Sequence, residues 1–291
     1  MKIRMFHLHA ITPLHVGIGQ AVGVVDLPIA REKATNFPMV PGSAIKGVLR
    51  DEFHDEHDKK QIFGPEKISD DSQAQAGALA FGDAHLLLFP VRSLHGVMAL
   101  VTCPFVLRRY VEDMRRSGID TLPAVPPLSD NQALVGQDNA NLLSGKVLLE
   151  DLDLDGKQDD TASKWAHWFV SQMYAGQADL QAEMQKHIVL VADEVFSFLV
   201  DTATEVRSRI RIDDGRRVVQ RGALWYEENL PAESVLWGVV GIGKSRGGIK
   251  GDLVRDEQQM EQVWNTGLSR ITTLQLGGKA TVGRGLIRFL A

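Results

Sequence analysis

Apolar and polar positions alternate in several short segments of the chain, a pattern that predicts β-strands. The alternation runs through residues 3–8, returns near Leu236 and is found again close to the end of the chain. Longer apolar runs at residues 78–88, 97–102 and 188–199 predict buried strands. A substantial sheet is therefore expected.

Apolar residues follow helical spacing in three other segments. The first follows Pro-Gly-Ser at residues 41–43, where Ser43 is the expected N-cap. The second covers residues 161–185 and the third residues 253–268, whereas the proline-rich residues 120–130 predict a surface loop. Strands and helices in this order predict an α+β fold, compatible with a ferredoxin-like sheet that carries insertions.

The segment from Thr204 to Tyr226 predicts a long β-hairpin. Apolar and polar residues alternate along both arms, and Asp214-Gly215 between the arms is a strong turn signal. Residues 206–221 contain six arginines and two aspartates. One local face of the protein is therefore expected to be strongly positive.

The total charge is acidic and, taken alone, argues against a nucleic-acid partner. The chain has 32 basic and 37 acidic residues, for a net charge of −5. The acidic residues concentrate in residues 51–58, 151–160 and 252–261, away from the predicted hairpin. Because phosphate binding depends on local positive charge, this total is compatible with one basic surface that binds nucleic acid.

Composition limits the cellular setting and the possible cofactor sites. The chain has 291 residues, 44% of them apolar, which suffices for one large domain or two small ones. Its single cysteine, Cys103, excludes an internal disulfide and a four-thiolate metal site, and it fits a reducing cytoplasm. The longest uncharged apolar segment, residues 235–243, is about half the length of a membrane span.

Three short segments offer backbone amides and basic side chains to an extended anion. Two are glycine-rich loops at residues 15–19 and 277–285. The third, residues 41–47, combines a helix N-terminus with the hydroxyl of Ser43 and the ammonium group of Lys46. Phosphate groups are the anions that such sites suit best.

A fourth segment matches the phosphate-binding loop of nucleotide hydrolases, with Gly238, Gly243, Lys244 and Ser245 at the required spacing. That loop must open a helix, because the helix N-terminus holds the phosphates. Residues 246–251 contain three glycines and favour a loop instead. A P-loop NTPase is therefore only a remote alternative.

Taken in order, these segments resemble a known family. Residues 12–53, 76–93 and 223–234, together with the closing glycine loop, are similar to the backbone subunit of the type III-B CRISPR (Cmr) effector complex, a member of the RAMP superfamily. A Csm-type backbone subunit is the nearest alternative. The resemblance implies a single domain over residues 1–291, with a ferredoxin-like (RRM-like) palm and a thumb hairpin at about residues 200–223.

The resemblance also implies partners and an activity. Head-to-tail copies of such subunits form a filament along a CRISPR guide RNA (crRNA), together with other Cmr-complex subunits and without a membrane. Their thumbs kink the duplex of guide and target RNA at regular intervals. The expected activity is that of an endoribonuclease that depends on a divalent metal, Mg²⁺ or Mn²⁺, and cuts the target RNA.

Candidate catalytic residues follow from the same resemblance. In such subunits an aspartate in the loop after the first strand supports metal-dependent cutting, and Asp26 occupies that position. A lone carboxylate can hold the metal against a phosphate while the nucleotide's own 2′-hydroxyl lines up with the phosphorus. His15 and Glu227 fall where the family places further residues, as proton donor and outer carboxylate respectively. The residues expected to bind RNA are Ser43, Lys46, Arg207, Arg209, Arg211, Arg216, Arg217, Lys279 and Arg284.

Each catalytic candidate also has a structural alternative. Asp26 is placed to cap the turn into Leu27-Pro28, and His15 is placed to bond the glycine loop. Glu227 has the alternative of being one of two solvated acids, together with Glu228. If these alternatives hold, the chain is a scaffold that binds guide RNA while another subunit cuts.

Overall fold

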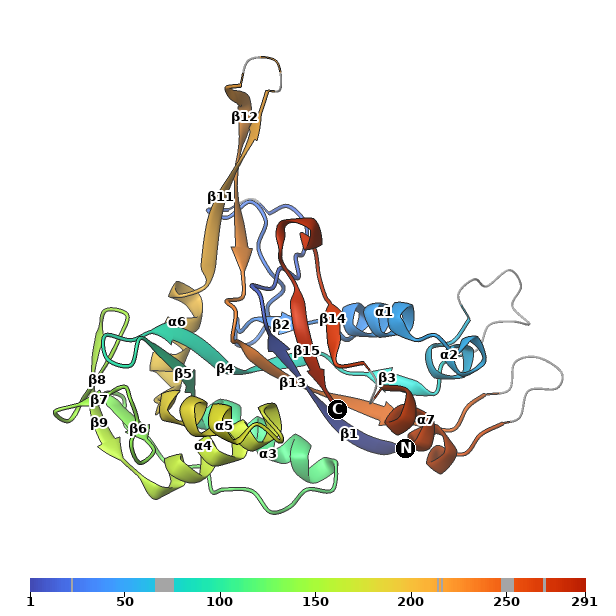
Figure 1. Ribbon diagram of the computed structural model, residues 1–291, viewed down its shortest axis with the longest axis horizontal. Coiled ribbons are helices and arrows are strands. Elements are labelled where there is room, and N and C mark those ends of the chain that lie inside the picture. Colours follow the sequence, from blue (N-terminus) through green and yellow to red (C-terminus); the bar gives the residue numbers. More distant parts are fainter. Residues whose placement is uncertain (22, 66–75, 214, 216, 247–253, 269–270) are drawn as a thin grey trace.

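One large mixed sheet forms the body of the protein (Figure 1). The computed structural model describes residues 1–21, 23–65, 76–213, 215, 217–246, 254–268 and 271–291. In these residues, thirteen strands join the sheet, and no helix has the length and apolar character of a membrane span. The α+β class predicted from the sequence is confirmed, and the finer ferredoxin-like assignment stays a prediction.

Strand β1 organises the sheet because it pairs on both of its edges. It is antiparallel to β13, with Phe6 opposite Gly238, and antiparallel to β15, with Leu8 opposite Phe289. The strand order is β14-β15-β1-β13-β4-β5-β10-β6-β9-β8-β7, with β2 paired to β4 and β3 to β13. The strands are β1 Lys2–Ala10, β2 Met39–Val40, β3 Leu79–Phe81, β4 Ala84–Arg92, β5 Met98–Thr102, β6 Gln132–Val135, β7 Leu142–Leu143, β8 Lys146–Leu149, β9 Leu152–Gln158, β10 Ile188–Val191, β13 Val235–Ile242, β14 Thr273–Gln275 and β15 Leu286–Leu290.

Helices cover both faces of this sheet. On one face, His7 of β1 contacts Tyr110 of α3 at 3.0 Å, and on the opposite face Arg4 pairs with Glu261 of α7. Trp237 lies against Tyr110 with ring centroids 5.6 Å apart, and both are fully buried. Burying each such side chain stabilises the fold by about 1.5–3 kcal/mol. The helices are α1 Gly42–Glu52, α2 Glu56–Phe63, α3 Pro104–Arg116, α4 Asp160–Met173, α5 Ala178–Met184, α6 Asp193–Thr202 and α7 Glu257–Leu268, with short 3-10 helices η2 Gln185–His187 and η3 Ala280–Val282.

Two sequence predictions about helices were wrong. The strand predicted over residues 188–199 ends at Val191, and helix α6 follows. The apolar run was ambiguous, because Phe196, Leu199 and Val200 also have helical spacing, and all three are buried inside α6. The helix predicted over residues 161–185 is two helices, α4 and α5, separated by a turn with Gly176 at φ 76°.

The cap predicted for the first helix was also wrong. Pro41, not Ser43, is the N-cap residue of α1, and it has no side-chain donor or acceptor. Instead the Asp83 carboxylate accepts a hydrogen bond from the Gly42 amide at 2.8 Å. Ser43 lies in the first turn with its side chain exposed, where its hydroxyl is open to solvent.

The P-loop alternative is wrong as well. Gly238 lies within β13, which pairs antiparallel with both β1 and β4, and not in a loop that opens a helix. A Cβ atom at Gly238 would lie 2.3 Å from Cζ of Phe6, so this glycine serves the close packing of β13 on β1. The match to the nucleotide-binding pattern has no structural counterpart.

A two-stranded ribbon projects from the body of the protein (Figure 1). Its strands are β11 Glu205–Ile212 and β12 Val219–Asn229, so it extends past the predicted thumb boundary at residue 223. The pairing shifts between Ile210 and Ile212, near Gly222 at φ 75°, which marks a bulge. Asp214 of the predicted turn and Arg216 lie outside the described residues.

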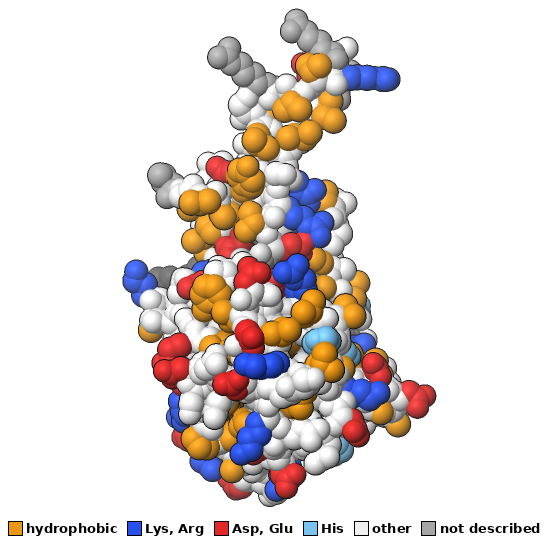
Figure 2. Space-filling model, turned by 90° about the vertical axis from the view of Figure 1, so that its left-hand side faces the viewer, with side chains coloured by type: hydrophobic (Ala, Val, Ile, Leu, Met, Phe, Trp, Pro, Cys, Tyr) orange, Lys and Arg blue, Asp and Glu red, His pale blue; other side chains and the backbone are white. Residues whose placement is uncertain are grey.

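The ribbon has two chemically different sides. Side chains alternate along each strand, and residues opposite one another across the pair share a side. On one side Arg209 faces Trp225 and Arg207 faces Glu227. Figure 2 shows the apolar side chains that run up the other side. That exposed apolar side is formed by Val206, Ile210, Ile212, Val219, Leu224 and Tyr226.

Candidate RNA-binding and cleavage site

The chain after β1 runs to the base of the ribbon and brings Asp26 to β12. One carboxylate oxygen of Asp26, Oδ2, accepts a hydrogen bond from the Tyr226 amide at 2.7 Å. The next residue continues the contact, since the Leu27 amide donates to the Tyr226 carbonyl at 3.1 Å. In the part of the chain that the structure describes, Oδ1 has no hydrogen-bond partner, so half of the carboxylate stays available to a ligand.

A hollow of about 710 Å³ opens beside Asp26. Its other charged lining residues are cationic, Arg211 from β11 and Lys279 from the glycine loop, and Trp225 adds an indole ring. Cations beside an aromatic ring are the usual means of holding the phosphates and bases of a single nucleic-acid strand. The full lining is Gln20, Ala21, Asp26, Leu27, Arg211, Gly222, Leu224, Trp225 and Lys279.

Glu227 lies at the centre of the cationic side of the ribbon and is only 2% exposed. Lys279 Nζ and Trp225 Nε1 each donate to its Oε1 at 2.8 Å, and Arg209 Nε donates to Oε2 at 3.1 Å. Burial raises the pKa of Glu227, but these hydrogen bonds outweigh it and lower that pKa to about 2. The alternative of a solvated acid is therefore wrong, and both oxygens are already engaged.

Glu227 should make the stability of the protein depend on pH. Its pKa in the folded state lies below the ordinary 4.5, so the ionised carboxylate favours folding above about pH 4.5, and this stabilisation is lost as the pH falls toward 2. Glu227→Gln removes it. In chemical denaturation we expect the variant to be less stable at neutral pH by on the order of 2–3 kcal/mol, with the difference shrinking below pH 4.5. A difference that stays constant down to about pH 3 would contradict this account.

His15 is buried, at 5% exposure, and its contacts are those of a structural residue. Its Nδ1 lies 2.6 Å from the Glu228 carbonyl, and a carbonyl can only accept, so Nδ1 carries the proton. The His15 carbonyl accepts from the Gly278 amide at 2.8 Å, and a Cβ atom at Gly17 would lie 2.8 Å from Nε2. His15 therefore ties the glycine loop to the ribbon, and its role as a proton donor stays a prediction.

Arg284 is a buried cation, 6% exposed, in the same glycine loop. Its Nε atom is buried without a partner, and within the described residues its guanidinium forms no ion pair. Burial and then the neighbouring charge of Arg207 lower the pKa of Arg284, against the opposing effect of the nearby Glu205 and Glu227 carboxylates. A buried guanidinium without a direct ion pair is costly, so a phosphate from outside the chain would be a favourable partner here.

The loop that carries Arg284 has its shape fixed by glycine. Gly285 has φ 79°, and a Cβ atom there would lie 2.1 Å from the Leu276 carbonyl oxygen. Lys279 itself adopts the left-handed conformation, with φ 66°, which turns its ammonium group toward Glu227. A bulkier residue at Gly285 would displace the loop and with it both cations.

The remaining RNA-binding candidates fall into two groups. Arg207, paired with Glu205, and Arg209 lie on the cationic side of the ribbon, and Arg217 is exposed near its tip. Ser43 and Lys46 belong to α1 and do not line the hollow. In the described part of the chain neither side chain has a hydrogen bond or ion pair, so their role in RNA binding stays a prediction.

Sequence reasoning missed two residues of this site, Trp225 and Glu228. The hairpin pattern alone misplaces Trp225, because a two-residue turn at Asp214-Gly215 would pair it with Thr204, whereas the observed register pairs it with Arg209. The sequence contained no signal for Glu228 either, because two adjacent glutamates are usually both exposed to solvent. Its contacts come from residues 29, 31 and 204, which no local pattern connects to it.

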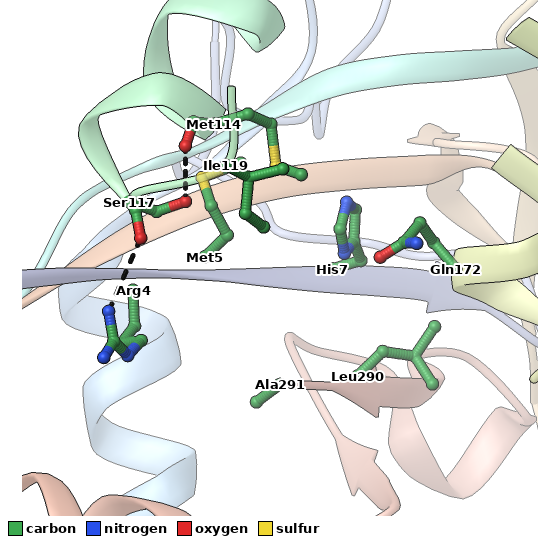
Figure 3. A pocket seen from close by; sticks show the side chains of 9 residues that line it. All are labelled: Arg4, Met5, His7, Met114, Ser117, Ile119, Gln172, Leu290 and Ala291. Atoms are coloured by element: carbon green, nitrogen blue, oxygen red, sulfur yellow. Dashed lines mark hydrogen bonds between the residues drawn. The ribbon is translucent and has the colours of Figure 1, made fainter. Parts of the chain in front are cut away.

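A second cavity, of about 480 Å³, lies at the far end of β1 and does not contribute to this site (Figure 3). His7 and Gln172 stand at one end of it, with Met114 and Ile119 at the other. Burial lowers the pKa of His7 to about 4, so its ring is neutral near pH 7, and its Nε2 lies 3.0 Å from the Tyr110 hydroxyl. Arg4, which also lines the cavity, is paired with Glu261, so little unpaired positive charge remains there for an RNA phosphate.

A divalent metal held by protein side chains alone does not fit these residues. Within the described ranges, no group of three or more His, Cys, Asp or Glu side chains comes together in the manner of a metal site. Asp26 offers one oxygen, and Glu227 has none to spare. Mg²⁺, however, commonly keeps several waters and binds through one or two carboxylates plus substrate phosphates. These residues therefore suit a metal ion that Asp26 would bind together with an RNA phosphate.

Comparison with known proteins gives the class of the chain. Residues 7–288 match the RAMP superfamily, and the chain belongs to that superfamily. It is 33% identical to the "CRISPR system Cmr endoribonuclease Cmr4" of Pyrococcus furiosus, over 99% of this chain and 95% of that protein. It is 25% identical to the "CRISPR system CMR subunit Cmr4" of Saccharolobus solfataricus, over 98% of this chain and 95% of that protein.

Within the superfamily, the chain is similar to Cmr4 over its full length. The crystal structure of oligomeric Cmr4 from Pyrococcus furiosus superimposes with a TM-score of 0.75 at 27% identity, covering 100% of this chain and 97% of that one. By contrast, the "CRISPR system Cms endoribonuclease Csm3" of Streptococcus thermophilus is 32% identical over only 26% of this chain and 40% of its own length. These lengths favour the Cmr-type subunit over the Csm-type alternative.

Proposed function

We propose that this chain is the backbone subunit of a type III-B CRISPR effector complex, that it binds crRNA as a filament of copies, and that it cuts the paired target RNA. The observation that carries the proposal is the half-free Asp26 carboxylate at the edge of a hollow whose other charged lining residues are Arg211 and Lys279. The relatives named Cmr4, one of them an endoribonuclease and one solved as an oligomer, support it.

Binding of the RNA backbone is assigned to two cations of the site that form no ion pair with a described residue. These are Arg284, which is buried, and Arg211, which lines the hollow, so both gain most from a phosphate. The Glu227 carboxylate partly neutralises Lys279 and Arg209. The positive charge that remains is therefore distributed along the ribbon. These contacts are with phosphates and therefore position an RNA without reading its sequence.

Cutting falls to Asp26, and Trp225 supplies a surface for a displaced base. An indole at the wall of the hollow can stack on a nucleotide that has left the duplex, which orients the 2′-hydroxyl toward its own phosphate. Asp26 would hold a divalent metal, which would supply stabilisation of the charge that develops on the phosphate. The surrounding cations disfavour such a metal until RNA phosphates arrive, so metal binding and target binding should be coupled.

The scaffold alternative makes a different prediction from the same geometry. His15 bonds the glycine loop as that alternative expects, whereas Glu227 is buried among cations and is not the solvated acid that the alternative expects. Asp26 does cap the ribbon through Tyr226, yet its Oδ1 has no hydrogen-bond partner among the described residues, and Asp26 lines the hollow. A role as a cap alone would not require Asp26 to line a hollow. This position favours the hypothesis that the chain is the subunit that cuts RNA.

The test is cleavage of a labelled target RNA by the guide-loaded complex reconstituted with this chain and the other Cmr subunits. We expect regularly spaced cuts with Mg²⁺ or Mn²⁺, and loss of cutting by at least about 100-fold in EDTA, while target binding measured by filter retention persists. A non-complementary RNA is the control and should stay intact. Undiminished cutting in EDTA would refute the metal requirement, and absence of any cut would leave the scaffold alternative.

We further propose that the protein works in the cytoplasm. Its single cysteine, Cys103, is buried, and no disulfide supports the fold. A cytoplasmic site of action also brings the complex to the transcripts that it would cut.

A further inference from the structure

Glu228 is buried, at 6% exposure, although it follows directly on Glu227. Alternation along β12 points the two side chains to opposite sides of the ribbon, so they have no partner in common. Glu228 Oε1 accepts from Arg31 Nη2 at 2.6 Å and from Thr204 Oγ1 at 3.0 Å, and its Oε2 accepts from the Ile29 amide at 3.1 Å. One carboxylate therefore joins the loop after β1 to the start of the ribbon.

The backbone of Glu228 makes two more contacts with the same loop. Its amide donates to the Leu27 carbonyl at 3.0 Å, and its carbonyl accepts from His15 Nδ1 at 2.6 Å. Together with the Tyr226 contacts to Asp26 and Leu27, these bonds lay the loop along β12 as a short added strand. Figure 1 shows this segment beside the base of the ribbon.

We propose that Glu228 is a positioning residue for target cleavage, an inference that rests on the proposed function. It acts through Asp26. The Ile29 amide and the Arg31 guanidinium both donate to the Glu228 carboxylate, and the only other carboxylate that Arg31 pairs with among the described residues is that of Asp201, at 3.5 Å. The segment belongs to no named strand and is held by isolated bridges and single hydrogen bonds, so loss of the Glu228 carboxylate should let Asp26 shift relative to Trp225 and Lys279.

A small shift is enough to matter for catalysis. Displacing a reacting group by about 1 Å can cost about 100-fold in rate, whereas phosphate contacts spread along an extended RNA are insensitive to it. Glu228 touches none of the cations that line the hollow. Its removal should therefore slow the cutting step and leave the affinity for RNA unchanged, a separation that a general loss of folding would not produce.

Glu32 provides a matched control in the same loop. It is also a carboxylate of low exposure, 12% for its side chain against 8% for Glu228, and it also holds the loop to the body of the protein. Its carboxylate accepts from Arg109 at 2.9 and 3.0 Å and from Thr35 at 2.7 Å, and it also pairs with His85. Glu32→Gln should cost comparable stability without touching the segment that carries Asp26.

The experiment compares Glu228→Gln, Glu32→Gln and wild type in the reconstituted guide-loaded complex. Single-turnover cleavage and target dissociation constants are measured together. We expect Glu228→Gln to cut about 10- to 100-fold more slowly with a dissociation constant within about twofold of wild type, and Glu32→Gln to cut at the wild-type rate. Glu228→Asp, which keeps the charge, should recover part of the loss.

A second measurement does not depend on cutting. In hydrogen exchange of the isolated protein, amides of residues 26–31 should lose protection in Glu228→Gln and keep it in Glu32→Gln. Equal cleavage rates for Glu228→Gln and wild type, or unchanged protection of this segment, would overturn the role of Glu228 alone. A wild-type complex that binds its target and cuts nothing would instead overturn the proposed function, and the positioning role with it.

Discussion

Replacing Asp26 by asparagine should stop target cleavage while target binding persists. Asparagine keeps an oxygen that can accept the Tyr226 amide, so the loop stays on the ribbon. What disappears is the negative charge beside the hollow, and with it the means of holding a metal or a proton at the phosphate. We expect the single-turnover rate to fall by about 100-fold or more, measured with the guide-loaded complex at saturating target RNA.

Asp120→Asn is the control for this variant. Asp120 is exposed, lies in the loop after α3 and makes no hydrogen bond or ion pair with the described residues. It should leave both rate and affinity as they are. If Asp26→Asn cuts as fast as wild type at equal assembly, the chain is a scaffold and the nuclease is elsewhere in the complex.

Replacing Arg284 by methionine should have opposite effects on RNA binding and on stability. The buried guanidinium forms no direct ion pair in the described chain, so an apolar side chain of similar length should stabilise the free protein by about 1 kcal/mol. The same change removes a phosphate contact. Guide RNA binding should weaken by about tenfold or more, and the salt dependence of log K should fall by about 0.7, the share of one phosphate on a single strand.

Thermal unfolding of the free protein and titration of guide RNA at several salt concentrations measure the two effects. Arg92→Met is the control, because Arg92 is an exposed residue of β4, paired with Glu150 and distant in the fold from the glycine loop. It should change neither quantity appreciably. A destabilised Arg284→Met protein, or one that binds RNA as tightly as wild type, would show that Arg284 is a structural cation after all.

The sequence predicted the sheet and the ribbon because their signals are local. Alternation at residues 3–8 and the turn at Asp214-Gly215 need no knowledge of the rest of the chain. It failed at residues 192–199, where an apolar run fits a buried strand and a helix equally well. It failed again at the cap of α1, because the acceptor is Asp83, far along the chain.

The candidate site was predictable in part, because only some of its signals are local. Lys279, Arg284 and Arg211 stood out as cations in loops or a hairpin. The resemblance to a family, rather than any local pattern, pointed to Asp26. That Glu227 is buried among cations and Glu228 among loop amides depends on which side of β12 each faces. This follows only once the register of the ribbon and the path of the loop are known.

The two-sided ribbon also restricts how this protein can change during evolution. An insertion of one residue in either arm would exchange the sides of every side chain beyond it, placing arginines such as Arg207 or Arg209 among the valines and isoleucines. Length can therefore vary in steps of two residues per arm, or at a bulge such as the one near Gly222, where the pairing already resets. Lineages that lengthened the ribbon should have done so at its tip or at that bulge, while the stretch next to Asp26 kept its length.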